Sequence, residues 1–287
     1  MNVFIEINRR VRRIYLYLGE VSQGTIISKL PGVSAVYNSL GPSTTPELPD
    51  QEVEIKHSGA KLYIDPSDYV AQNIYKQGSY EPQVANKIIQ QLEIDDVAID
   101  IGAHIGHHTV TMRQAVGSSG SVFAFEPLPK NAELIRQTIN INGWENVHIE
   151  QKAVSSNTGD FEMIIPDQGN TGRAIAGRDL DEYESKIQVS SERLSDFLKE
   201  SDIDHVDLMK IDIEGGEHDL LVDTQEILHR IDCILIEIHT TILTSDELET
   251  IFKILSESGQ LVYHNGRPVT LETLESESEK QLVWMRE

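Results

Sequence analysis

The chain has 287 residues, with 24 Lys and Arg against 47 Asp and Glu, so its formal net charge is −23 with histidine neutral. This length suits one elaborated α/β domain with an appendage. The acidic balance argues against a nucleic-acid partner, because such binding draws its affinity from Lys and Arg on phosphates. The single cysteine, Cys233, lies among Ile and Leu residues, which predicts a buried thiol and a cytoplasmic protein.

Residues 1–50 are predicted to form a helical extension followed by a loop. Four arginines and regularly spaced apolar residues occur within residues 1–14, as in a helix with one apolar face. Such a helix could pack on the main domain, or it could be a basic amphipathic anchor at the inner face of an anionic membrane. Prolines and glycines between residues 31 and 50 predict the loop. No apolar run is long enough to span a bilayer.

Residues 51–287 are predicted to form the main domain, with its core at about 95–240. It begins with a β-hairpin over 53–64 and a helical stretch over about 67–92. From residue 97, short apolar runs alternate with helix-length segments. These runs are Val97 to Ile101, Val122 to Phe125, Val147 to Ile149, Val206 to Ile211 and Cys233 to Ile238. Such alternation predicts a doubly wound α/β fold, with a parallel sheet covered by helices on both faces.

The segments between these strands carry the remaining predicted elements. Helices are expected to begin at His107 or His108, near Pro129, after Gly216 and at Ser245. The crossover before Val206 is longer than usual, and it contains an extra predicted strand, 159–165. It also contains a predicted loop, 167–176, which is expected to lie near the functional site. Two more strands are predicted near the end of the chain, at 261–264 and 281–285.

The first of the parallel strands runs into a glycine turn that opens a helix. Asp100 ends the strand, and Gly102 and Gly106 follow it. Glycine lets the backbone pass close to a ligand, and free amides at a helix start favour an anionic group. The pattern lacks the third glycine of a dinucleotide-binding loop, which counts against NAD. Tight packing of the helix on the strand is the alternative explanation for both glycines.

A second carboxylate, Glu126, follows the neighbouring strand. Carboxyl ends of adjacent parallel strands meet at one edge of a sheet, where Glu126 could accept both hydroxyls of an adenosine ribose. Capping of the following turns is the alternative role for Asp100 and Glu126.

The chain resembles the class I S-adenosylmethionine-dependent methyltransferases, and within them the FkbM-like family. Four blocks that occur in the family's order and spacing carry this resemblance, which covers about residues 60–240. They are Val97 to Thr109, Phe125-Glu-Pro127, Leu208 to Glu217 and Ile236-Glu-Ile-His239. The segment Gly78-Ser-Tyr-Glu81 also looks like the family's approach to the first strand.

The resemblance implies a Rossmann-like seven-stranded sheet, mostly parallel with the last strand antiparallel, and S-adenosylmethionine as cofactor. The cofactor's methionine and sulfonium end would be lined by Asp100, Gly102, Ala103 and Gly106. Glu126 would bind the ribose and Ala153 would lie near the adenine. Tyr80 and Glu81 would close over the cofactor, or Glu81 would simply begin the helix at Pro82.

Three further residues are candidates for catalysis at the same edge. Asp212 and Glu214 follow the strand Val206 to Ile211, and His239 follows the strand Cys233 to Ile238. Transfer to an alcohol requires removal of a proton, and the unperturbed pKa of histidine lies near neutrality, so His239 is the candidate general base. It could instead orient a loop or donate to substrate, leaving the base to Asp212 or Glu214.

Two roles nearby stay open at this point. Glu217 is expected in the first turn of a helix, where an acid stabilises the helix dipole. Asp212 and Glu214 could hold a divalent metal with Glu237 or His239, although no metal is expected.

The resemblance implies an O-methyltransferase acting on a hydroxyl of a sugar, glycolipid or other small metabolite. The acceptor could be lipid-linked if the N-terminal arginines meet a membrane. A cofactor-binding protein of this fold without catalysis, and an NAD-dependent oxidoreductase, are the alternatives. The sequence leaves the oligomeric state open.

Overall fold

The computed structural model describes residues 52–55, 59–66, 68–165, 175–176, 185–276 and 281–286. The predicted N-terminal extension, residues 1–50, and most of the predicted loop at 167–176 lie outside these residues. Among the described residues, no helix has the length and apolar character needed to cross a bilayer.

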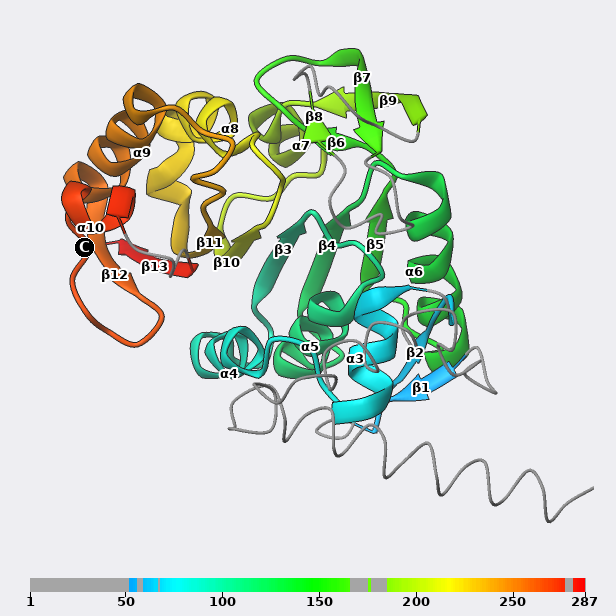
Figure 1. Ribbon diagram of the computed structural model, residues 1–287. Coiled ribbons are helices and arrows are strands. Elements are labelled where there is room, and N and C mark those ends of the chain that lie inside the picture. Colours follow the sequence, from blue (N-terminus) through cyan, green and yellow to red (C-terminus); the bar gives the residue numbers. More distant parts are fainter. Residues whose placement is uncertain are drawn as a thin grey trace, which may run out of the picture. The chain divides into compact units, whose positions relative to one another are not determined.

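The described residues build a seven-stranded sheet in the order β12-β13-β11-β10-β3-β4-β5 (Figure 1). Its strands are β3 (Val97–Ile101), β4 (Ser121–Phe125), β5 (Val147–Glu150), β10 (Val206–Ile211), β11 (Ile231–Glu237), β12 (Gly259–Tyr263) and β13 (Gln281–Arg286). The pairs among β11, β10, β3, β4 and β5 are parallel, whereas β13 runs antiparallel to both β11 and β12. The predicted sheet, with its last strand antiparallel, is confirmed.

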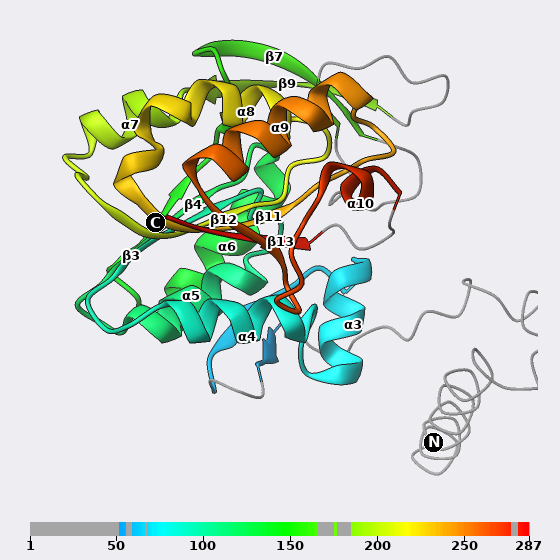
Figure 2. The same ribbon diagram turned by 90° about the vertical axis from the view of Figure 1, so that its left-hand side faces the viewer.

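Helices cover both faces of this sheet (Figure 2). One face carries α4 (Pro82–Gln91), α5 (His107–Val116) and α6 (Pro129–Asn142), and the other carries α7 (Leu194–Glu200), α8 (Glu217–Thr224) and α9 (Ser245–Ser258). Alternate residues of each strand point to opposite faces of the sheet. Ala98 and Leu208 pack against apolar residues of α4 and α5, whereas Met209 packs against apolar residues of α8 and α9. Because both faces are buried, the strands read as continuous apolar runs.

Local sequence signals explain where several helices begin and end. Pro129 begins α6, since proline fits the first helical position, and Gly143 ends it with a left-handed φ of 65°. Thr244 and Glu247 form a capping box at the start of α9.

The segment before β3 contains the predicted hairpin, made of β1 (Glu52–Glu54) and β2 (Lys61–Tyr63). The helical stretch predicted over 67–92 is divided into α3 (Tyr69–Gln77) and α4. Gly78 ends α3 with a φ of 82°, and Pro82 begins α4. A glycine and a proline four residues apart thus separate two helices.

A small second sheet fills the long crossover between β5 and β10. Its order is β6-β9-β7-β8, with β6 (Ala153–Val154), β7 (Gly159–Ile165), β8 (Ile175–Ala176) and β9 (Ser185–Glu192). The predicted strand at 159–165 is β7, whereas β9 was not predicted. The 3₁₀ helix η4 (Gln225–Arg230) joins α8 to β11, and α10 (Leu271–Ser276) precedes β13.

Candidate active site

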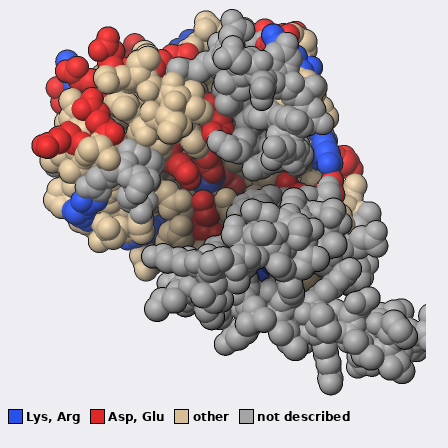
Figure 3. Space-filling model, viewed as in Figure 1, with Lys and Arg blue, Asp and Glu red and all other residues tan. Residues whose placement is uncertain are grey.

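A pocket lies where β3, β10 and β11 end and the loops after them begin. Among the residues in its wall are seven of the predicted site residues: Tyr80, Glu81, Gly102, Ala103, Asp212, Glu214 and His239. Lys210 and Glu237 also line it. Asp and Glu side chains gather near the middle of the face seen in Figure 3, where the surface is hollowed. The topology therefore brings the candidate catalytic residues and the glycine turn to one place.

Four predicted cofactor residues are not part of this wall: Asp100, Gly106, Glu126 and Ala153. Ala153 begins β6 in the small second sheet and is partly buried. The contact predicted between Ala153 and adenine stays a prediction.

Asp100 is fully buried behind the pocket. The Thr109 hydroxyl donates to Asp100 Oδ2 at 2.6 Å, and Lys210 Nζ lies 3.7 Å from Asp100 Oδ1. Asp100 Oδ1 has no hydrogen-bond partner among the described residues. A buried carboxylate oxygen that lacks a hydrogen-bond partner can accept a hydrogen bond from a ligand, for example from the ammonium of an amino acid.

The two glycines of the turn have structural reasons of their own. Gly102 has a φ of 81°, and a Cβ there would lie 1.9 Å from the carbonyl oxygen of Asp212. Gly106 has a φ of 87°, and its Cβ would lie 3.0 Å from the side chain of Ile135. The turn is held to β4, because the amides of Gly102 and Ala103 both donate to the carbonyl of Phe125 at 3.0 Å. Close packing is thus sufficient to require glycine at 102.

Glu126 is buried and held in one orientation after β4. One carboxylate oxygen accepts from the His104 amide at 2.9 Å, and the other accepts from the Leu128 amide at 2.9 Å and from the Asn131 side chain. Burial raises the pKa of Glu126 to about 7, against the lowering effect of His104 and of these hydrogen bonds. The side chain is therefore preorganised at the strand end where a ribose contact was predicted.

The segment Tyr80-Glu81 is fixed by two histidines at the start of α5. His107 Nε2 lies 3.0 Å from the Tyr80 carbonyl oxygen, and His108 Nε2 lies 3.1 Å from Glu81 Oε2. Burial lowers the pKa of His108 to about 4, so its ring is neutral at pH 7. Glu81 adopts a φ of 44°, which is uncommon for a residue with a Cβ. Gln281 donates to the other oxygen of Glu81 at 3.2 Å.

Lys210 is a buried cation that sequence reasoning missed. Its ammonium lies 3.1 Å from Asp212 Oδ2, in addition to its contact with Asp100. Burial opposes the charge of Lys210, but Asp212 and Asp100 raise its pKa. Burial also opposes the charge of Asp212, yet Lys210 and His239 hold the pKa of Asp212 below its usual range. Lys210 therefore keeps a carboxylate ionised at the wall of the pocket.

Three carboxylates from separate elements meet beside Lys210. One oxygen each of Glu81, Asp212 and Glu237 lies within 4.8 Å of the others. Burial, together with the charges of Asp212 and Glu81, raises the pKa of Glu237 to about 7. Oxygen ligands in this number could hold a hard cation, and they make this part of the pocket strongly negative.

His239 is paired with Glu217, the first residue of α8. The His239 Nδ1 is hydrogen-bonded to Glu217 Oε1, while its Nε2 lies 3.5 Å from Glu214 and 3.9 Å from Asp212. Burial opposes protonation, but Glu217, Glu214 and Asp212 raise the pKa of His239 to about 9. The pKa of His239 therefore lies above the unperturbed, near-neutral value for which it was chosen as candidate general base. Glu217 does begin its helix as expected, and in addition its carboxylate binds this imidazole.

Comparison with known proteins identifies the family. The model of the FkbM methyltransferase domain matches residues 100–262. The hexuronic acid methyltransferase AglP of Haloferax volcanii is 25% identical over 180 residues, covering 62% of this chain and 69% of that protein. The 2-O-methyltransferase NoeI of Sinorhizobium fredii is 25% identical over 172 residues, covering 54% of this chain and 70% of that protein.

Among solved structures, an O-methyltransferase from Bacillus cereus aligns with a TM-score of 0.45 at 11% identity, covering 76% of this chain and 89% of that chain. The family assignment rests on the sequence model, which spans more than half of the chain. The chain belongs to the FkbM family of methyltransferases.

Proposed function

We propose that this methyltransferase uses S-adenosylmethionine to methylate a hydroxyl group of a sugar or glycan. The observation that carries the proposal is the orientation of His239. Its Nδ1 is engaged by the buried Glu217, so Nε2 faces the pocket that also contains the glycine turn. An alcohol must lose its proton during methyl transfer, and an imidazole held this way is placed to assist. AglP and NoeI, by their names, methylate a hexuronic acid and a 2-O position.

The residues around the glycine turn suit the proposed donor. Asp100 Oδ1 is a buried acceptor without a hydrogen-bond partner in the part of the chain that the structure describes, and it would take the ammonium of the methionine end. Gly102, Ala103 and Gly106 would line the same end, and Glu126 would bind the ribose. When bound, S-adenosylmethionine supplies an electrophilic methyl group on a cationic sulfur. The negative charge of the nearby carboxylates favours a cation in the pocket.

The proton of the acceptor has two candidate destinations. His239 Nε2 accepts it only when the ring is neutral, and with a pKa of about 9 the neutral form costs about 3 kcal/mol at pH 7. A cationic group bound in the pocket would lower that pKa by charge repulsion and reduce the cost. Glu237, whose pKa is about 7, is the second candidate, because a general base works best with a pKa near the working pH.

The chain's main contribution to catalysis would be alignment and exclusion of water. Methyl transfer is an in-line displacement, so the acceptor oxygen must be held behind the methyl group. Carboxylates of Asp212, Glu214 and Glu237 would accept hydrogen bonds from neighbouring hydroxyls of a sugar. A metal at the carboxylates is not required by this scheme, since Lys210 already balances part of their charge.

We also propose how the two parts of the chain are arranged for this function. Residues 51–287 would form the catalytic domain and residues 1–50 an extension that could pack on it or meet a membrane. In the latter case the acceptor would be lipid-linked and the enzyme would work at the inner face of the membrane. We expect no nucleic-acid substrate, given the net charge of −23.

Product analysis with isotopically labelled S-adenosylmethionine tests this function. Hexose, hexosamine and hexuronic acid glycosides would be offered as acceptors, and the labelled methyl located by mass spectrometry. We expect an O-methyl ether, with transfer reduced at least tenfold in His239→Gln. Transfer should be unchanged in His218→Gln, which alters a partly buried histidine outside the pocket that pairs with the exposed Asp219. An N-methyl product, or cofactor binding with no transfer to any acceptor, would contradict the proposal.

A further inference from the structure

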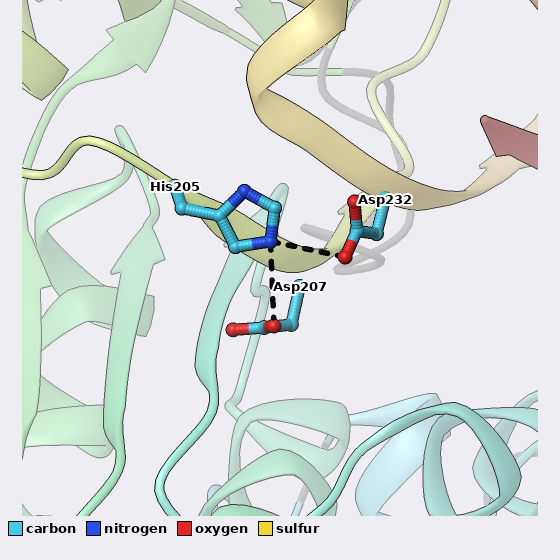
Figure 4. A group of neighbouring side chains, drawn as sticks. All are labelled: His205, Asp207 and Asp232. Carbon is cyan, nitrogen blue, oxygen red and sulfur yellow. Dashed lines mark hydrogen bonds and ion pairs between the residues drawn. The ribbon is translucent and has the colours of Figure 1, made fainter. Parts of the chain in front are cut away.

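A second group of potential ligands lies at the opposite end of the parallel strands. His205 precedes β10, Asp207 is the second residue of β10, and Asp232 is the second residue of β11. Figure 4 shows the imidazole of His205 directed between the two carboxylates. Asp207 is five residues before Asp212, or roughly 16 Å along an extended strand. The group is therefore separate from the pocket for methyl transfer.

The three side chains approach one another at distances that suit a shared ion. His205 Nε2 lies 3.0 Å from Asp232 Oδ2 and 3.5 Å from Asp207 Oδ1. All three ligand atoms lie within 4.8 Å of one another. Ligands bound to one metal at about 2.1 Å are separated by about 3.0–3.4 Å in octahedral or tetrahedral geometry. The separation of 3.0 Å lies in this range and that of 3.5 Å lies just above it, while the two carboxylate oxygens lie within 4.8 Å of each other.

Each carboxylate is anchored through its other oxygen. The amide of Val97 donates to Asp207 Oδ2 at 2.8 Å, and the guanidinium of Arg286 binds Asp232 Oδ1. These contacts leave one oxygen of each aspartate directed toward His205. Fixed outer contacts of this kind orient the ligands of metal sites and raise their affinity.

The register of the sheet makes a cation favourable at this position. Val206 pairs with Ile231 and Leu208 pairs with Cys233, so Asp207 and Asp232 occupy neighbouring positions on adjacent strands. Like charges on neighbouring strand positions destabilise a sheet. The side chains of Asp207 and Asp232 are 25% and 45% exposed, so an ion from solvent can reach them.

We propose that His205, Asp207 and Asp232 bind a divalent transition-metal cation that joins the starts of β10 and β11. One imidazole nitrogen and two carboxylate oxygens suit Zn²⁺ or Mn²⁺ better than Ca²⁺ or Mg²⁺, which prefer oxygen ligands alone. The remaining coordination positions face solvent and would hold water. The role is structural, because no residue of the methyl-transfer pocket takes part.

Calorimetric titration of the full, chelator-treated chain with Zn²⁺ at pH 7.5 tests this site without any measurement of methyl transfer. We expect binding that weakens at least tenfold in His205→Ala and in Asp232→Asn. Two controls should keep this binding: His218→Ala, whose histidine pairs with a single carboxylate, and Glu237→Gln, which alters the carboxylate group of the methyl-transfer pocket. Zn²⁺ should also raise the melting temperature of the wild type more than that of His205→Ala.

Three results would overturn the proposal. They are absence of Zn²⁺ binding to the wild type, binding that His205→Ala and Asp232→Asn leave unchanged, and binding that only Glu237→Gln removes. Asp232→Asn serves as the second variant in case His205→Ala folds poorly. Since neither readout depends on methyl transfer, failure of this site and failure of the proposed function are separate results.

Discussion

Glu217 and His239 form a buried hydrogen-bonded pair across two elements: Glu217 is fully buried at the start of α8, and His239 follows β11. The carboxylate binds Nδ1 and leaves Nε2 facing the pocket. Since a buried carboxylate is stable only when paired, the pair is expected to act as one unit. This relationship connects the fold of the sheet edge to the proton transfer proposed for the reaction.

Replacing Glu217 by glutamine should lower the pKa of His239 from about 9 toward its ordinary value. The reason is that glutamine keeps the shape of the side chain but carries no charge. Titration of the His239 ring by NMR measures this pKa directly. The rate of methyl transfer should rise with pH as His239 loses its proton, and the midpoint of that rise should move to lower pH together with the pKa. Asp219→Asn, which changes an exposed acid in the same helix, should leave both unchanged. An unaltered His239 pKa in Glu217→Gln would contradict the pairing.

The protein should become less stable as the pH rises from about 5 to 9. In the folded state Glu126 and Glu237 have pKa values of about 7 and His239 of about 9, all above their ordinary values of 4.5 and 6.5. His108, with a folded pKa of about 4, acts in the opposite direction below pH 6.5, but the two glutamates outweigh it. The folded chain therefore binds more protons than the unfolded chain in this range, so the free energy of unfolding falls as pH rises. The contribution of the two glutamates is present below pH 4.5 and lost through pH 7. That of His239 is present below pH 6.5 and lost through pH 9.

Urea unfolding at pH 5.5, 7 and 9 measures this dependence. Glu237→Gln removes one of the titrating groups, so its stability should fall less between pH 5.5 and 7 than that of the wild type. A stability that rises steadily over this range would show that the buried groups are not perturbed as described.

Replacing Lys210 by methionine should cost about 3–5 kcal/mol of unfolding free energy, because Asp100 and Asp212 would lose their buried cation. Adding Asp100→Asn should restore part of this loss, since it removes one of the uncompensated charges. Denaturant titration of both single variants and the double variant gives the coupling energy. Additive effects in the double variant would mean that Lys210 and Asp100 do not interact.

Gly102→Ala should be far more destabilising than Gly143→Ala. Both glycines have left-handed φ values, 81° and 65°, but a Cβ at 102 would strike the Asp212 carbonyl, whereas nothing lies within 4 Å of a Cβ at 143. We expect a loss of about 1 kcal/mol at 143 and of more than about 3 kcal/mol at 102, where the left-handed strain and the clash add. If thermal or urea unfolding gave the same loss of unfolding free energy for both variants, the close approach of Gly102 to Asp212 would be unimportant for stability.

The strands of the sheet could be predicted from the sequence to within two residues at each end. Val97–Ile101 and Val206–Ile211 match β3 and β10, because strands buried on both faces read as unbroken apolar runs. The sequence does contain the signals that divide residues 67–92 into two helices, because Gly78 ends α3 and Pro82 begins α4. The strand β9 was missed because its sequence contains polar residues on one face of a small, partly exposed sheet.

The site was less predictable, because its contacts join distant parts of the chain. Gln281 reaches Glu81 across 200 residues, and no local pattern could reveal that contact. Glu217 binds His239 across 22 residues, so its position in a helix explained only half of its role. Lys210 did carry a signal, since a lysine near the end of a buried strand requires carboxylate partners.

Calorimetric titration with S-adenosylmethionine shows whether the pocket binds the proposed methyl donor. We predict micromolar binding to the wild type, weakened by roughly 1.5–3 kcal/mol in Glu126→Ala, the range for a hydrogen bond to a charged group. Glu133→Ala, an exposed change on α6, should bind as the wild type does. Absence of S-adenosylmethionine binding, or tighter binding of NAD, would contradict the assignment of the pocket.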